Sequence, residues 1–145
     1  MMNNEEKTKS KFNVIFKLIN KFKEVWLTSN DYEKSFIETT LGAAIFYLPT
    51  TKKTFSGLIS EEASKISKKK WVKEHQYPRK LSAKFILTNP PKNVDEFKKI
   101  YYEKYGIWNW VTKVENTNLR ESQKENNFTT PEKSYKKCGI KLIKL

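Results

Sequence analysis

The sequence predicts an α+β fold that is mostly helical and forms a single domain. The first observation behind this prediction is a run of apolar residues at helical spacing near the start of the chain. The second is a pair of short segments rich in strand-forming residues, at 71–75 and 107–111. A chain of 145 residues can bury one core, and its 37% hydrophobic and 14% aromatic content argues against wholesale disorder.

Two helices are expected at the start of the chain. Residues 1–10 are polar and charged, and we expect them to be loose. From Lys11 onward, apolar residues recur on one face of a helix, which predicts an amphipathic helix. Asn30, with Glu33 three residues later, has the pattern of a reciprocal cap for a second helix, which Pro49 stops. The apolar face of the first helix consists of Phe12, Ile15, Phe16, Ile19, Phe22 and Trp26.

The middle of the chain shows short and mixed signals. Residues 50–59 contain threonines and a glycine, which suit a loop or a short strand. Ser60, followed by two glutamates, starts a short helix that runs to about Lys69. The segment Trp71–His75 follows, and we expect it to be the central strand.

Two further helices are expected before the second strand. Apolar spacing predicts a helix over 81–88, and the two prolines at 90–91 cannot continue it. Asn93 with Glu96 resembles another cap, and the helix that it starts ends at Gly106.

The last part of the chain is predicted to hold a strand, a capped helix and a linker. Residues 107–111 favour a strand, and Thr112 with Glu115 forms a capping box for a helix. Residues 125–134 are a polar linker, and the alternation at 139–143 indicates a final strand. We therefore divide the chain into a flexible N-terminus (1–10), a helical segment packing on the core (11–69), a core (70–124) with a helical insertion (81–105), and a linker with a C-terminal extension (125–145).

The charge balance is strongly basic and uneven. The net charge is +13, and residues 61–145 carry twenty basic and ten acidic side chains. A surplus of this size attracts polyanions, so nucleic acid is the expected partner. The alternative is that the lysines only keep the protein soluble.

Several classes of protein are excluded by the composition. The single cysteine, Cys138, excludes an internal disulfide, and one Cys with one His cannot form a four-ligand zinc site. No apolar run approaches the roughly 20 residues of a membrane span. The start of the chain lacks the pattern of a signal peptide, so we expect a cytoplasmic protein without a membrane partner.

The only histidine lies in a segment that could carry chemistry. Glu74 and His75 end the central strand, Pro78 then turns the chain, and Arg79 and Lys80 follow. A neutral imidazole accepts a proton near physiological pH. A forked guanidinium binds phosphate through two hydrogen bonds.

This segment resembles the first half of an HNH site, also called a ββα-metal site. The segment Trp110-Val111-Thr112, which leads into a helix that bears Asn116, resembles the second half of such a site in phage and homing endonucleases of this family. The ending from Tyr135 to Ile140 is also similar to endings of small phage proteins of this type. The resemblance covers roughly residues 70–120. It implies a small core of a β-hairpin and a helix, and it implies that the protein is a phage-like or mobile-element DNA endonuclease.

The resemblance implies a role for each residue of the site. His75 is expected to be the general base on a water, and Arg79 is expected to orient the phosphate. Glu74 and Asn116 are expected to bind Mg²⁺ or Mn²⁺ but not zinc, with Asn118 as the alternative ligand. Further contacts to nucleic acid are expected from Lys68, Lys69, Lys70, Lys73, Lys80, Lys113 and Arg120.

Other interpretations of the same residues remain open. The chain could be a non-catalytic nucleic-acid-binding protein with an HNH-like fold, or a small structural or regulatory protein. The first two helices also fit a helix-turn-helix motif, although the second lacks the polar residues of a recognition helix. Trp108 and Trp110 alternate, so we expect one in the core and the other facing out, where it could stack on single-stranded bases. The expected partner is DNA, with RNA as an alternative, and the protein is expected to be a monomer or a homodimer.

Overall fold

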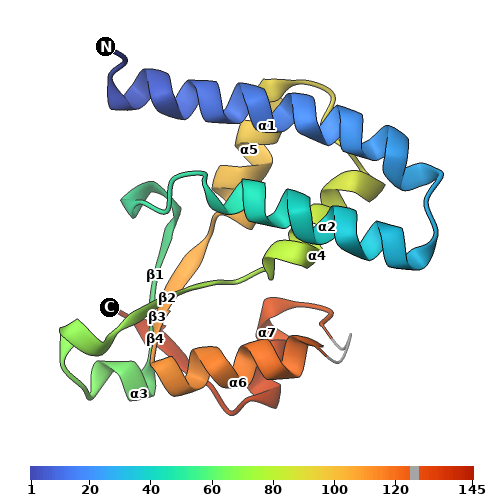
Figure 1. The fold of residues 1–145 in the computed structure, drawn as a ribbon. Helices are drawn as coiled ribbons and strands as arrows, with labels where there is room; N and C mark the ends of the chain where they lie inside the picture. The colour runs from blue at the N-terminus through green and yellow to red at the C-terminus, as the bar shows by residue number, and fades with distance from the viewer. Residues whose placement is uncertain (125–127) are drawn as a thin grey trace. The chain divides into compact units, whose positions relative to one another are not determined.

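The computed structural model describes residues 1–124 and 128–145, and it is a mixed α+β fold with far more helix than strand (Figure 1). The predicted fold class is confirmed at this level. The chain forms two compact units. The helical unit consists of residues 1–50 and 78–106, and the sheet unit consists of residues 51–77 and 107–145. Residues 51–69, which the sequence grouped with the N-terminal helices, lie in the sheet unit.

The helical unit begins with a capped helix, α1 (Asn4–Leu27). The side chain of Asn3 accepts the N–H of Glu6 at 2.9 Å, and the Glu6 carboxylate accepts the N–H of Asn3 at 2.8 Å. This reciprocal cap satisfies two backbone donors at the helix end. Residues 4–10, for which the polar composition indicates a loose segment, belong to this helix, whereas residues 1–3 precede it.

The other helices of this unit pack closely against each other. The predicted cap at Asn30 starts α2 (Asp31–Phe46), which packs against α4 (Arg79–Thr88). Their closest approach is at Gly42, where an added Cβ would lie 2.9 Å from the Arg79 carbonyl. Helix α5 (Val94–Ile100) continues as one π-helical turn, η3 (Tyr101–Tyr105). The core is aromatic, since the ring of Phe12 lies 5.6–5.7 Å from those of Phe97, Tyr101 and Tyr102.

The sheet unit is built on four strands in the order β2-β3-β1-β4. These are β1 (Phe55–Ser60), β2 (Val72–His75), β3 (Trp108–Val111) and β4 (Leu142–Lys144). Strand β3 pairs parallel to β1 and antiparallel to β2, and β4 pairs antiparallel to β1. The expected strands near 71–75, 107–111 and 139–143 are confirmed, whereas the ambiguous segment at 50–59 contains β1.

Short helices connect these strands, and two longer ones cover a face of the sheet. The expected helix from Ser60 is shorter than predicted, and the expected linker at 125–134 is wrong from Pro131 onward, where a helix begins. Residues 125–127 lie outside the described residues. Thr130 caps this helix, and Pro131 occupies its first turn, where a missing N–H costs nothing. The helical segments are η1 (Lys52–Thr54), α3 (Glu61–Ser64), η2 (Lys68–Lys70), α6 (Lys113–Lys124) and α7 (Pro131–Lys137).

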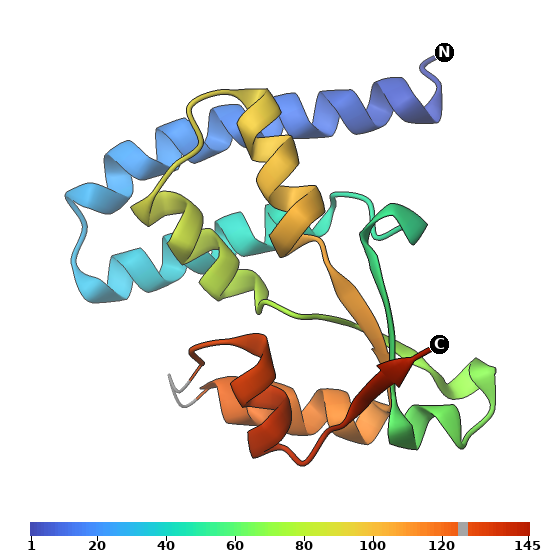
Figure 2. The same cartoon turned by 180° about the vertical axis from the view of Figure 1, so that it is seen from behind.

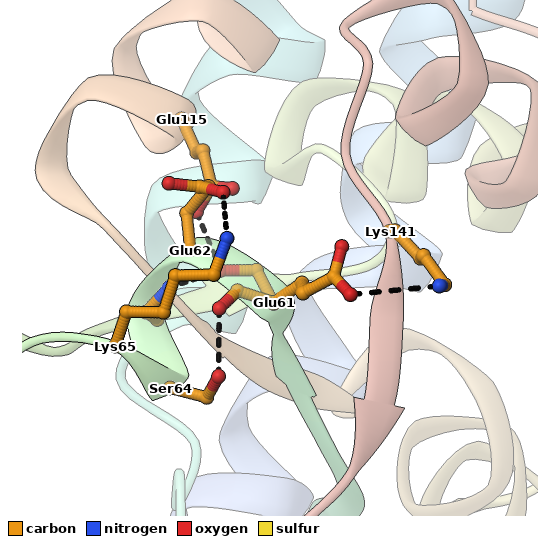
Figure 3. Close-up of polar contacts among 8 residues, drawn as sticks. Glu61, Glu62, Ser64, Lys65, Glu115 and Lys141 are labelled. Carbon is orange, nitrogen blue, oxygen red and sulfur yellow. Dashed lines mark hydrogen bonds and ion pairs between the residues drawn. The ribbon is translucent and has the colours of Figure 1, made fainter.

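The start of α6 is fastened to the sheet by the predicted capping box. The carboxylate of Glu115 accepts the N–H of Thr112 at 2.8 Å, and it also accepts the hydroxyl of the buried Ser60 at 2.6 Å. Helix α3 lies beside this point, and its exposed ion pairs join Glu62 to Lys65 and Glu61 to Lys141 (Figure 3). Exposed pairs of this kind contribute little stability, so the buried cap is the stronger tie.

Candidate functional site

Strand β2 places Glu74 and His75 on opposite faces of the sheet. In the antiparallel pair with β3, Glu74 lies opposite Asn109 and His75 lies opposite Trp108. Directly opposed residues share a face, whereas successive residues of a strand alternate between faces. The two neighbours therefore point away from each other, although the sequence predicts that they act at one site.

The Glu74 face is the one covered by helices α6 and α7, which lie together on one side of the strands in both views (Figures 1 and 2). The hydroxyl of Tyr135, on α7, donates to Glu74 Oε2 at 2.8 Å, and Asn109 Nδ2 approaches the same oxygen at 3.4 Å. Asn109 Nδ2 also donates to the Tyr135 hydroxyl at 2.8 Å. The carboxyl group is thus held inside the fold, between a strand and a helix.

Burial changes the acidity of this network. Desolvation raises the pKa of Glu74 from 4.5 to about 7, while the hydrogen bonds from Tyr135 and Asn109 oppose the rise. Burial also raises the pKa of the Tyr135 hydroxyl, and the nearby charge of Glu74 adds to that effect. At neutral pH, Glu74 is therefore divided between its protonated and ionised forms, and Tyr135 stays a proton donor.

Asn109 extends the network to a third strand. Its side-chain oxygen accepts the hydroxyl of Ser56 at 2.5 Å and the amide of Gln76 at 3.3 Å. Asn109 is fully buried, and all four of its polar contacts are with residues of the sheet unit. Neither this residue nor Tyr135 is among the site residues that the sequence predicts. A signal was present, since asparagine is disfavoured in strands and needs partners when aromatic and aliphatic neighbours bury it.

The two residues named as metal ligands lie in different surroundings, and metal binding by them stays a prediction. Glu74 Oε2 already accepts two donors inside the protein. Asn116 is half-buried and Asn118 is exposed, both on α6. Among the described residues, no three side chains of His, Cys, Asp or Glu gather into a group that could hold a metal ion. A hard divalent cation binds several oxygen ligands, so Glu74 would first have to leave its present partners.

The opposite face of the sheet carries aromatic and basic side chains. The ammonium of Lys73 lies 4.6 Å from the ring centre of Trp108 and 5.8 Å from that of Trp110, whose rings meet edge to face. The two tryptophans do not lie on opposite faces, because residues two apart in a strand share a face, and the expected difference between them is one of burial. Trp108 is buried and Trp110 is half-buried. We call this surface the tryptophan face, and it consists of Phe55, Trp71, Lys73, His75, Trp108 and Trp110.

Arg79 and Lys80 belong to the helical unit, at the start of α4. The guanidinium carbon of Arg79 lies 3.3 Å from the ring centre of Phe46, and the ammonium of Lys80 donates to the hydroxyl of Ser35 at 2.5 Å. Both contacts are with α2. The two cations therefore help to join α2 to α4, and phosphate orientation by Arg79 stays a prediction.

The remaining predicted cations are exposed and lie in the sheet unit. Lys68, Lys69 and Lys70 form the single turn η2, immediately before β2. Lys113 and Arg120 lie on α6, which covers the Glu74 face. Only the first group is adjacent in sequence to the tryptophan face, and the ammonium of Lys68 lies 5.9 Å from the ring centre of Trp71.

Comparison with known proteins returns no relative for this chain. No protein-family model, no curated protein and no solved structure matches it. No helix in the described part of the chain combines the length and the apolar character that crossing a bilayer requires.

Proposed function

We propose that this protein binds nucleic acid and hydrolyses phosphodiester bonds in it, with His75 as the general base. The observation that carries this proposal is the position of His75 on the tryptophan face, on the same strand and the same side as Lys73. A base that activates water must lie where the phosphate binds, and a lysine two residues away on the same face supplies charge for that phosphate. The resemblance to HNH endonucleases supports the same role for His75.

The charge of the sheet unit supports binding of a polyanion. Its residues include fifteen Lys and Arg against seven Asp and Glu, a surplus of eight. One of the seven acids is Glu74, whose raised pKa leaves it partly neutral at pH 7. Binding through such a surface releases counterions, so affinity must fall steeply with salt.

The chemical step requires one proton to leave the attacking water and one to reach the leaving oxygen. His75 accepts a proton from water as the water oxygen forms a bond to phosphorus, while the bond from phosphorus to the leaving oxygen breaks and that oxygen takes a proton from solvent. Lys73 neutralises charge on the phosphate as it develops. We assign no part of this step to a metal ion, but the assay contains Mg²⁺ or Mn²⁺ because the resemblance to HNH enzymes implies one.

The alternative is a protein that binds nucleic acid without cleaving it. The engagement of Glu74 favours this alternative, because its carboxyl group is buried among Tyr135 and Asn109 and faces away from His75. An acid held by these contacts on one face of the sheet cannot take part in chemistry on the other face.

Cleavage of DNA by the purified full-length chain separates the two proposals. Supercoiled plasmid and circular single-stranded DNA are incubated with protein in Mg²⁺, in Mn²⁺ or in EDTA, and the products are separated on agarose. We expect cleavage with metal, lowered about 100-fold or more by His75→Ala, as for loss of a general base. Lys133→Ala, an exposed residue of α7, is the charge control and should leave the rate unchanged.

Each other outcome has one meaning. DNA that stays intact but shifts on a native gel, equally for the wild type and His75→Ala, would establish the binding protein. Cleavage that survives His75→Ala would remove the histidine from the mechanism. Absence of both cleavage and binding at low salt would refute the proposed function, and leave a structural or regulatory protein.

A further inference from the structure

We propose that the tryptophan face takes single-stranded nucleic acid, with an unpaired base stacked on Trp110. This inference rests on the proposed function and adds the form of its substrate. Three properties of the face carry it: one buried ring that serves as a floor, two half-buried rings that pack against each other, and cations that lie against these rings.

Trp108 is the floor of the face. Its ring is 3% exposed and lies 4.7 Å from that of Phe55, and its indole N–H donates to the backbone oxygen of Thr51 at 3.0 Å. A buried indole with a satisfied N–H has a fixed orientation. Trp108 therefore supports its neighbours and is too enclosed to stack on a ligand.

Trp110 and Trp71 are the rings that remain half-buried beside this floor. Their ring centres lie 5.8 Å apart at an interplanar angle of 49°. Trp71 is also anchored, because its indole N–H donates to the backbone oxygen of Ala63 at 2.7 Å. Trp110 packs edge to face against Trp108, with ring centres 4.8 Å apart. Rings held by such contacts lose little freedom when a base stacks on them, so the surface is prepared for a planar ligand.

The cations on this face match a nucleotide, which has a planar base next to a negative phosphate. The Lys73 ammonium lies against the rings of both Trp108 and Trp110, and Lys68 lies over Trp71. Lys73 and the Lys68–Lys70 turn are exposed to solvent. The ammonium of Lys73 would thus lie close to the phosphate of a nucleotide whose base stacks on Trp110.

Unpaired bases fit this arrangement better than a duplex does. Bases in a duplex are stacked on each other and present only their edges, whereas a single strand can turn a base onto an aromatic ring. The tryptophan face lies on a sheet, and its rings come from three neighbouring strands or their flanks, so it is broad enough for more than one nucleotide. We infer a preference for single strands over duplexes of the same sequence.

Fluorescence anisotropy tests this preference directly. A labelled mixed-sequence strand of about 12 nucleotides, within the span of single-strand-binding folds, is compared with its duplex. EDTA is present throughout, so that cleavage cannot remove the probe. We expect tighter binding of the single strand, and a loss of about 10-fold or more in Trp110→Ala, as for removal of one stacking ring. Trp110→Phe keeps an aromatic ring, so its affinity for the single strand should lie between those of the wild type and Trp110→Ala.

Controls distinguish stacking from charge and from misfolding. Lys73→Ala should weaken both probes and reduce the salt dependence of binding, whereas Lys133→Ala on α7 should change neither. Circular dichroism reports whether each variant folds. If Trp110→Ala does not fold, Trp110→Phe is used in its place. In the wild type, binding of a single strand should also quench tryptophan fluorescence.

Failure of this inference can be told apart from failure of the proposed function. Equal affinity for both probes, unchanged by the Trp110 variants, would overturn the single-strand inference and leave nucleic-acid binding and cleavage standing. Binding of neither probe at low salt would overturn both. A single-strand preference that persists in Trp110→Ala and Trp110→Phe would place the stacking elsewhere and refute the role of Trp110.

Discussion

Replacement of Glu74 by glutamine is the sharpest test of the buried network, because it removes one charge and keeps the shape. The native carboxyl group keeps its proton up to about pH 7, whereas the unfolded one releases it near 4.5. Between these values the native state binds more protons than the unfolded state, so stability falls as pH rises. The difference between the two pKa values corresponds to about 3 kcal/mol in the free energy of unfolding, and this contribution is lost once the pH exceeds the folded-state pKa.

The assay is urea unfolding of the wild type and Glu74→Gln at several values between about pH 4 and about pH 8, which span this window. Tryptophan fluorescence is a suitable signal, since Trp71, Trp108 and Trp110 all lie in the sheet unit. A glutamine oxygen can still accept the Tyr135 hydroxyl, so the variant is expected to fold. We expect the stability of the variant relative to the wild type to increase by about 3 kcal/mol from the acidic to the alkaline end.

The control is Glu132→Gln, an exposed acid on the same helix as Tyr135. It removes a surface charge and leaves the buried carboxyl group of Glu74 in place, so the pH dependence of the wild type should remain. Parallel stability curves for the wild type and Glu74→Gln across this range would refute the reasoning, and would show that Glu74 ionises inside the fold without cost.

Three further predictions concern single contacts, each checked by chemical denaturation. Gly42→Ala should destabilise the helical unit by about 1–3 kcal/mol, despite the better helix propensity of alanine, because the new methyl meets the backbone of Arg79. Asn30→Ala should cost about 1 kcal/mol through loss of the cap on α2, whereas Asn20→Ala, in the exposed middle of α1, should cost nothing. Tyr135→Phe should cost about 1–3 kcal/mol and raise the pKa of Glu74 further, since it removes the donor that stabilises the carboxylate.

Local signals in the sequence predicted most of the helix boundaries. The caps at Asn30, Asn93 and Thr112 are formed as expected, because a capping box depends on residues only three apart. The same capping box at Asn3 and Glu6 indicates the start of α1, and an N-cap threonine followed by a proline, Thr130-Pro131, indicates α7. At both places the capping pattern is a better guide than the polar composition of the segment.

The arrangement of the sheet could not be predicted in the same way. The parallel pairing of β1 with β3 joins segments between which β2 and residues 78–106 of the helical unit lie in the chain, and no periodicity in either strand indicates the partner. The contact between Glu74 and Tyr135 likewise joins residues 61 positions apart. Alternation along β2 was nevertheless available from sequence, and it separates Glu74 from His75 as soon as the strand is recognised.

This separation makes the roles of Glu74 and His75 distinguishable by experiment. If they act on opposite faces, Glu74→Gln should change stability and its pH dependence but leave cleavage within a few-fold of wild type under conditions where both proteins are folded. His75→Ala should abolish cleavage and leave the Glu74-dependent pH profile intact. If both residues serve one metal site, as the resemblance to HNH enzymes implies, the two variants should lose cleavage together, about 100-fold or more each. Equal losses in folded variants would require Glu74 to leave Tyr135 and Asn109 when substrate binds, and Tyr135→Phe should then increase the rate, because it weakens the contact that holds the acid away.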